Sequence, residues 1–169
     1  MKAIILIATI AMGSGMLAQA ETLTPKRFPV NVMYNEQLEC LAMNIYHEAR
    51  SDSRLGQEAV GMTTINRVYH GKYPPTICEV VYQSYTNSAG QPIRNKCQFS
   101  WFCDGKSDIP EDAERYQQAM RIAAYVLRTH SDYRDVTDGA IMYHAAYVNP
   151  YWTDAYERTV RIDSHIFYK

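Results

Sequence analysis

The ten residues Asn44–Ser53, NIYHEARSDS, decide how the rest of the chain is interpreted. They end a helical pattern that starts near Asn35, with apolar residues at i, i+3, i+4, i+7 and i+11 forming one stripe: Leu38, Leu41, Ala42, Ile45 and Ala49. Glu48 borders this stripe in the last turn of the helix. Burial and the free carbonyl groups of a helix C-terminus both disfavour a carboxylate, so the sequence predicts a raised pKa for Glu48.

Two interpretations of Glu48 remain open at this point. A carboxylic acid with a raised pKa is what general-acid cleavage of a glycosidic bond requires. From spacing alone, however, an ordinary glutamate on the helix flank, paired with Arg50 or Arg54, is the simpler interpretation. Asp52 is the other nearby carboxylate that could support Glu48, although its position favours helix capping.

Histidine and cysteine chemistry is less well supported. A zinc protease motif requires a second histidine four residues after His47, and Ser51 occupies that position. The other histidines are isolated and are predicted to be hydrogen-bonded structural residues, so no metal site and no cofactor are expected: His70, His130, His144 and His165. The segment MYHAAYVNPYW (142–152) differs, because it gathers tyrosines and a tryptophan around His144 and could line a sugar groove.

The N-terminus carries the pattern of a secretory signal peptide. Residues 1–20 combine Lys2, an apolar run and the small-residue site AQA, and the run is too short and too interrupted for the ~20 apolar residues that span a bilayer. Residues 21–34 are a leader segment, and residues 35–169 form a single domain. We therefore expect an exported protein, periplasmic or secreted, without stable membrane insertion. The chain is nearly neutral, with a formal net charge of −1, which argues against a nucleic-acid partner.

Four cysteines in an exported chain indicate disulfides, for which three connectivities are possible. Cys97 and Cys103 are close enough to close a local loop, and this pairing leaves Cys40 with Cys78. A zinc site is a weaker alternative, because no CxxC pair and no suitably spaced histidine is present.

The remaining pattern is that of an α+β domain, mainly helical with a small irregular sheet. A second helix is expected over 54–69, capped by Ser53 or Asp52, with an inward face that consists of Leu55, Ala59, Met62, Ile65 and Tyr69. Thr76 and Glu79 form a capping box for a short helix, and Pro110 is placed at the first position of a helix over 110–130. Strands are expected at 97–103, 139–144 and 158–168, and residues 84–96 as polar turns.

Several long motifs in the same order resemble the spore-cortex-lytic (SleB-like) cell-wall hydrolases. They are CLAMNIYHEARSDSRLGQEAVGMTTINRVYHGKYPPTICEVVYQ, CQFSWFCDG, MYH and HIFY, and they run from Cys40 to Tyr168. The resemblance implies a lysozyme-like fold and a catalytic glutamate at Glu48. It also implies a set of residues that line or support the cleft: Gln57, Asn66, Gln98, Ser100, Trp101, Tyr143 and His144. Where the family usually reads Gly-Glu after EAR, this chain has Ser51-Asp52, so a supporting role for Asp52 is less secure.

The resemblance further implies a monomeric enzyme that cleaves the glycan strands of peptidoglycan as a lytic transglycosylase, without a cofactor. Glu48 would protonate the bond between N-acetylmuramic acid and N-acetylglucosamine, and a 1,6-anhydro product would follow. A hydrolytic muramidase, which commonly uses a second acid, is the first alternative. An N-acetylmuramoyl amidase, which normally requires zinc, and a non-catalytic peptidoglycan-binding module are the others.

Overall fold

A computed structural model describes residues 32–131 and 135–169 of the chain, with side chains from Asn35 onward. The predicted signal peptide and nearly all of the predicted leader segment lie outside these residues. The first helix, α1 (Val32–Ala49), begins three residues before Asn35, where the sequence pattern placed its start. Among the described residues, no helix is long and apolar enough to cross a membrane.

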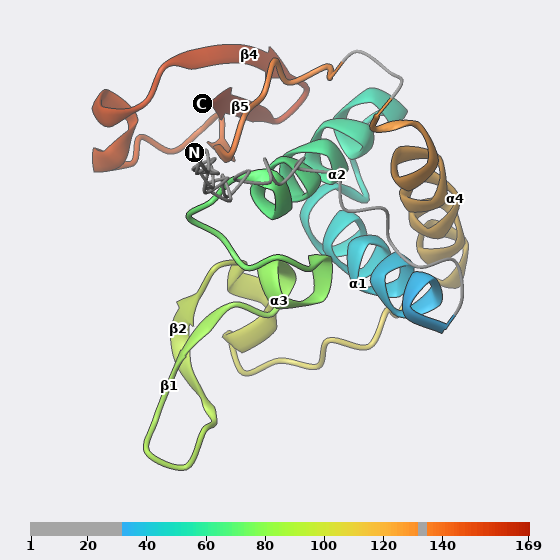
Figure 1. Cartoon of the computed structure of the whole chain (residues 1–169), viewed down its shortest axis with the longest axis vertical. Coiled ribbons are helices and arrows are strands. Elements are labelled where there is room, and N and C mark those ends of the chain that lie inside the picture. Colours follow the sequence, from blue (N-terminus) through green and yellow to red (C-terminus); the bar gives the residue numbers. More distant parts are fainter. Residues whose placement is uncertain (1–31, 132–134) are drawn as a thin grey trace, which may run out of the picture.

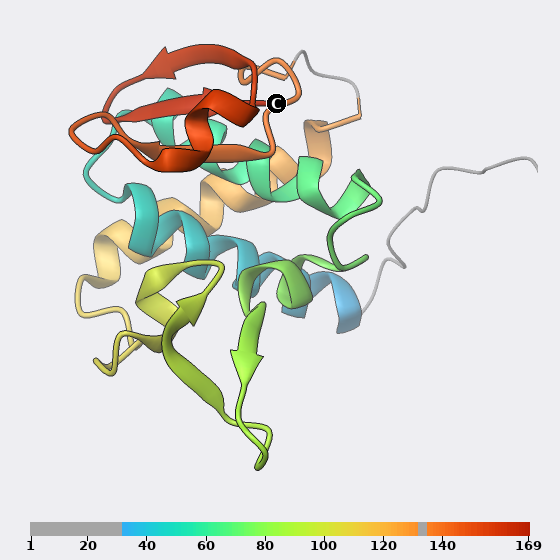
Figure 2. The same cartoon turned by 90° about the vertical axis from the view of Figure 1, so that its left-hand side faces the viewer.

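Helix α1 is the centre of the molecule. It packs against α2 (Arg54–Tyr69), α3 (Ile77–Val81) and α4 (Ala113–Thr129), as Figures 1 and 2 show. The predicted stripe of α1 is buried, apart from the partly exposed Leu38 at its beginning. The interior of the helical part is built from aliphatic side chains of all four helices, among them Leu41, Ile45, Ile65, Ile77, Val80, Val81 and Val126.

The helix boundaries follow from side-chain caps. Ser53 accepts a hydrogen bond from the Gly56 N–H at the start of α2, and Thr76 accepts one from the Glu79 N–H at the start of α3. Helix α4 begins at Ala113 behind Asp112, which caps the Arg115 N–H, and therefore starts later than predicted. Pro110 precedes the helix instead of opening it, because Asp112 supplies the cap two residues further on.

The inward face of α2 is shorter than predicted. Its central members Ala59, Met62 and Ile65 are buried, whereas Leu55 and Tyr69 at the two ends are about half exposed.

The lower part of the molecule is a hairpin of β1 (Ser84–Thr86) and β2 (Pro92–Cys97), in a segment that was expected to form turns alone. The expected strand over 97–103 is wrong, since Ser100–Cys103 forms a 3-10 helix, η1. The Cys97–Cys103 disulfide explains this result: it holds the two Cα atoms 6.1 Å apart, whereas a strand of that length would separate them by about 20 Å.

The upper part is an antiparallel sheet in the order β3-β5-β4, formed by β3 (Met142–Ala145), β5 (His165–Tyr168) and β4 (Arg158–Ile162). The single strand expected over 158–168 is therefore two strands, which turn at Asp163 with a positive φ of 46°. A second 3-10 helix, η2 (Tyr151–Ala155), lies between β3 and β4 in the chain. In Figures 1 and 2 this sheet lies above α1 and the β1–β2 hairpin lies below it.

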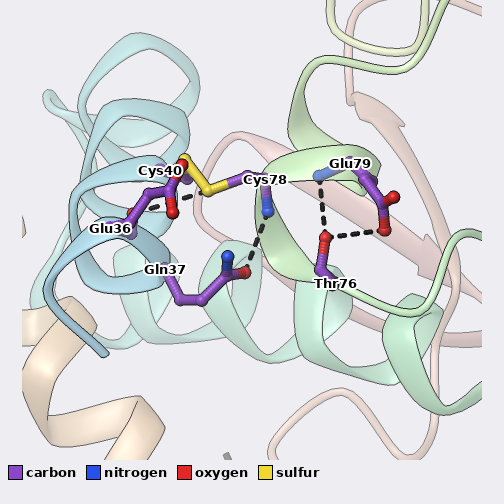
Figure 3. The surroundings of a disulfide bond; sticks show 6 residues. All are labelled: Glu36, Gln37, Cys40, Thr76, Cys78 and Glu79. Atoms are coloured by element: carbon purple, nitrogen blue, oxygen red, sulfur yellow. Dashed lines mark hydrogen bonds between the residues drawn. A yellow bond between two sulfur atoms is a disulfide. The ribbon is translucent and has the colours of Figure 1, made fainter. Parts of the chain in front are cut away.

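Both predicted disulfides are present. Cys40 and Cys78 join α1 to α3 (Figure 3), and Cys97 and Cys103 join the end of β2 to η1. The Gln37 side chain strengthens the first connection, because its Oε1 accepts a hydrogen bond of 3.1 Å from the Cys78 N–H.

Candidate functional site

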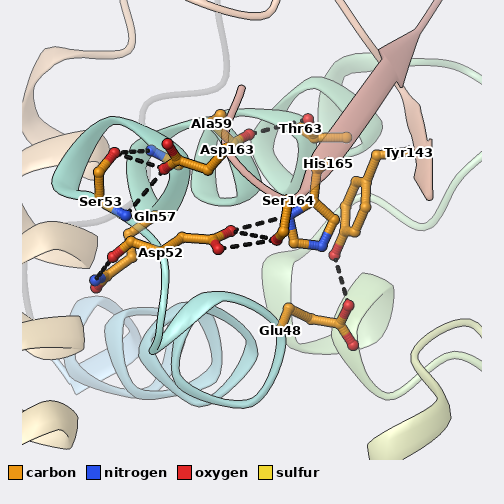
Figure 4. Close-up of polar contacts among 11 residues, drawn as sticks. Glu48, Asp52, Ser53, Gln57, Ala59, Thr63, Tyr143, Asp163, Ser164 and His165 are labelled. Atoms are coloured by element: carbon orange, nitrogen blue, oxygen red, sulfur yellow. Dashed lines mark hydrogen bonds and ion pairs between the residues drawn. The ribbon is translucent and has the colours of Figure 1, made fainter. Parts of the chain in front are cut away.

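Glu48 lies in the last turn of α1, on the side that faces the three-stranded sheet. Its Oε2 accepts a 3.2 Å hydrogen bond from the hydroxyl of Tyr143 on β3 (Figure 4). Burial raises the pKa of Glu48, and this effect outweighs the hydrogen bond from Tyr143 and the charge of Arg67, which both act to lower it. The site thus contains an acid that keeps its proton to higher pH than an ordinary glutamate.

Arg67 on α2 is a buried cation beside this acid, and sequence reasoning missed it. Its Nε donates a 2.7 Å hydrogen bond to the Ile141 carbonyl, and its guanidinium lies 5.1–5.8 Å from the ring centres of Tyr73, Phe99 and Tyr143. Burial lowers the pKa of Arg67. Neighbouring side chains act in the opposite direction, and Glu48 is the one carboxyl group among the side chains that raise this pKa. Arg67 can therefore stabilise Glu48 once that side chain has lost its proton.

Trp101 of η1 is attached to α1 one helical turn before Glu48. Its indole Nε1–H donates to Asn44 Oδ1 at 3.2 Å, and Asn44 in turn donates to Thr64 at 3.0 Å, which ties η1 to α1 and α2. The His47 ring stacks on the Trp101 ring with centres 4.4 Å apart. Since Asn44 is one helical turn before Glu48, these contacts fix the backbone that carries the acid.

Asp52 lies apart from Glu48 and is committed to other partners. It accepts hydrogen bonds from the Ser164 hydroxyl at 2.8 Å and from His165 Nδ1 at 3.0 Å, and it is largely buried (Figure 4). The edge of the His165 ring packs on Tyr143 with ring centres 5.1 Å apart. Asp52 thus acts on the site indirectly, by holding the histidine against which the tyrosine partner of Glu48 rests.

The turn between α1 and α2, which contains Asp52 and Ser53, is held by a second set of contacts. Asp163 accepts hydrogen bonds from the Ser53 N–H at 2.9 Å and the Ser53 hydroxyl at 2.6 Å. A Cβ at Gly56 would lie 2.5 Å from Asp163 Oδ2, so the close approach of α2 to the β4–β5 turn requires glycine there. The α1–α2 turn and the β4–β5 turn therefore form one clamp, which consists of Asp52, Ser53, Asp163, Ser164 and His165.

The structure brings only some of the residues predicted to line the cleft close to Glu48. Tyr143 contacts it, and Trp101 is connected to α1 through Asn44. His144 points to the opposite face of the sheet, where its Nε2 accepts from the Tyr168 hydroxyl at 2.9 Å and its ring packs against Trp152.

The other four predicted residues occupy different surroundings. Gln57 is buried and donates to the Asp52 carbonyl, and Asn66 donates to Asp135 and to the Ala140 carbonyl. Gln98 lines a hollow beside the hairpin, and Ser100 is exposed at the start of η1. Their roles in binding substrate stay predictions. In the described part of the chain, no group of three or more His, Cys, Asp or Glu side chains is arranged to hold a metal ion.

Comparison with known proteins identifies the family. Residues 51–168 match the family model described as Cell Wall Hydrolase. The chain belongs to the cell wall hydrolase family. The matched region begins three residues after Glu48, so the family assignment rests on the rest of the domain. None of the curated proteins matches this cell wall hydrolase at a significant level.

Two solved structures resemble this cell wall hydrolase in fold. The catalytic domain of the Bacillus cereus SleB protein superimposes with a TM-score of 0.63 at 20% identity, covering 89% of this chain and 99% of that chain. The catalytic domain of the germination-specific lytic transglycosylase SleB from Bacillus anthracis superimposes with a TM-score of 0.56 at 23% identity, covering 86% of this chain and 100% of that chain. The predicted family and the lysozyme-like α+β fold are confirmed, and the protein is an enzyme that acts on peptidoglycan.

Proposed function

We propose that this enzyme is a lytic transglycosylase that cleaves the bond between N-acetylmuramic acid and N-acetylglucosamine, with Glu48 as its acid and base. The observation that carries this proposal is the solitary position of Glu48. Burial raises the pKa of Glu48. Among the described residues, Tyr143 is its one side-chain hydrogen-bond donor, and no carboxylate is among the groups that shift its pKa. The name of the Bacillus anthracis structure, a lytic transglycosylase of the same fold, agrees with the proposal.

The chemistry needs one acid in two protonation states. Protonated Glu48 gives its proton to the glycosidic oxygen as the bond from that oxygen to the muramic C1 breaks. The C6 hydroxyl of the same muramic acid then attacks C1, and the Glu48 carboxylate accepts the hydroxyl proton. The new C1–O6 bond closes a 1,6-anhydro ring, no water is consumed, and Glu48 ends in its starting state.

The surroundings of Glu48 suit both halves of this cycle. Burial keeps the acid protonated for the first step. The Tyr143 hydroxyl and the Arg67 charge stabilise the carboxylate that exists between the two steps. A hydrolytic muramidase commonly uses a second carboxylate, and Asp52, the nearest acid in sequence, is occupied by Ser164 and His165.

Mass spectrometry of the soluble products from purified peptidoglycan sacculi tests the proposal, with the wild type and Glu48→Gln digested in parallel. We expect muropeptides that end in 1,6-anhydro-muramic acid from the wild type and none from the variant, whose circular dichroism should be unchanged. Reducing muramic ends would replace the proposal with a hydrolytic muramidase, and free stem peptides would replace it with an amidase. Retention on sacculi without new chain ends would identify a binding module.

A further inference from the structure

A second feature of the surface, separate from Glu48, has the composition of a binding site. The β1–β2 hairpin and the residues that flank it surround a hollow of about 740 Å³, within the range of about 300–1,000 Å³ typical of ligand sites. Most of the residues that line it are of polar types: Gln83, Ser84, Tyr85, Asn95, Lys96, Cys97 and Gln98. The Cys97–Cys103 disulfide fixes the base of the hairpin to η1, so the hollow has a rigid floor.

The charge and hydrogen-bonding groups of this hollow favour an anionic peptide. Lys96 supplies the one charge of the lining, and it takes part in none of the ion pairs formed among the described residues. The lining also contains the side-chain amides of Gln83, Asn95 and Gln98, which can hydrogen-bond to peptide groups. Tyr85 adds a ring that is 74% exposed. A ligand with carboxylates and backbone amides meets all three features.

The hollow is connected to the catalytic region by a short piece of chain. Gln98 lines it, and the next residue, Phe99, packs on the Arg67 guanidinium at 5.1 Å and on the Tyr143 ring at 6.5 Å. In peptidoglycan, the stem peptide is attached to the same muramic acid whose C1 is attacked. A stem peptide therefore leaves the sugar close to the acid, and Phe99 connects that neighbourhood to the residues of the hollow.

We propose that the hairpin hollow binds the stem peptide of peptidoglycan, with Lys96 pairing with a peptide carboxylate. This inference rests on the proposed function for the choice of glycan substrate, and it adds that the enzyme prefers strands that carry peptides over bare glycan. Lys96 and the amide side chains of the hollow are then specificity residues and take no part in bond cleavage.

A competition assay measures this preference without relying on the products. Glu48→Gln and Glu48→Gln/Lys96→Met are pelleted with intact sacculi in the cold, and soluble glycan strands compete for them, either with their stem peptides or after an amidase has removed the peptides. We expect strands with peptides to displace Glu48→Gln at about tenfold lower concentration than stripped strands, and the second change to remove that difference. Lys72→Met in the same background is the control, because Lys72 is an exposed lysine outside the hollow.

Kinetics supply the second measurement. In the wild-type background, Lys96→Met should raise KM on intact sacculi, leave kcat within about twofold and leave activity on stripped glycan unchanged, and Lys96→Arg should restore KM. Equal competition by both kinds of strand against Glu48→Gln, or an undiminished preference in Glu48→Gln/Lys96→Met, would overturn the inference. A failure of the proposed function is distinguishable, because it changes the identity of the products whereas this inference concerns only which strands are bound.

Discussion

The hydrogen bond between Tyr143 and Glu48 allows the acid to be tuned without removing it. Tyr143→Phe deletes the hydroxyl and keeps the ring that packs on His165 and Phe167. The bond stabilises the Glu48 carboxylate and so lowers the pKa of Glu48 against the opposing effect of burial. Its loss must therefore raise that pKa further.

The size of the effect follows from the geometry. Hydrogen bonds to charged groups contribute roughly 1.5–3 kcal/mol, and at 3.2 Å we take the lower end, about 1.5 kcal/mol. A difference of ~1.36 kcal/mol corresponds to a tenfold change in an ionisation constant. Loss of the hydrogen bond should therefore displace the pH at which Glu48 ionises by about one pH unit. A general acid works only while protonated, so activity falls as the pH rises through its pKa. The alkaline limb of kcat/KM should thus move upward in Tyr143→Phe.

The assay is the initial release of anhydro-muropeptides from sacculi between pH 5 and 9, expressed as the ratio of variant to wild type so that titration of the substrate cancels. Tyr116→Phe is the matched control, because Tyr116 is also partly buried and packs against Tyr46. An alkaline limb that stays in place in Tyr143→Phe, or moves downward, would refute the role assigned to this hydrogen bond and the assignment of the limb to Glu48.

Two further predictions concern the parts that hold the site together. Asp52→Asn should destabilise the fold by about 1–3 kcal/mol in urea unfolding, because one amide oxygen cannot replace both carboxylate oxygens toward Ser164 and His165. The control is Asp154→Asn, which changes an exposed residue and should leave stability unchanged. Equal urea midpoints for the two variants would contradict the role of Asp52 in the clamp. Replacing Cys40 and Cys78 by alanine should cost about 4 kcal/mol and replacing Cys97 and Cys103 about 2 kcal/mol, since the first bond closes the longer loop. Urea midpoints in the reverse order would be inconsistent with this loop-length argument.

The helices were predictable because their signals are local. The apolar stripe of α1, the bounds of α2 and the cap at Thr76 depend on residues three or four positions apart, and the structure confirms them. The strands were less predictable because distant or unusual features decide them. A local disulfide overrides the alternating pattern of 97–103, and the β4–β5 turn uses Asp163 at a positive φ, where glycine or asparagine is the usual signal.

The site was predictable only in part. The raised pKa of Glu48 was predictable from its position at the end of an apolar stripe. Spacing alone favoured an ordinary glutamate, and the catalytic interpretation came from the resemblance to the SleB-like family. Arg67 was missed because a basic residue is normally assumed to face solvent, although it shares a face of α2 with Val60 and Thr64 at i, i+4 and i+7. His144 was expected to line the cleft together with Tyr143, yet neighbouring residues of a strand point to opposite faces, and the structure follows that rule.

The order of the upper sheet has a consequence for biosynthesis. Strand β5 lies between β3 and β4 and is the last of the domain's elements to leave the ribosome. Until His165–Tyr168 has been added, β3 lacks the strand that positions Tyr143, and Asp52 lacks its partner His165. A nascent chain that has not yet added β5 therefore contains Glu48 without the surroundings that tune it, and on the proposed function the acid is completed only once β5 has joined the sheet.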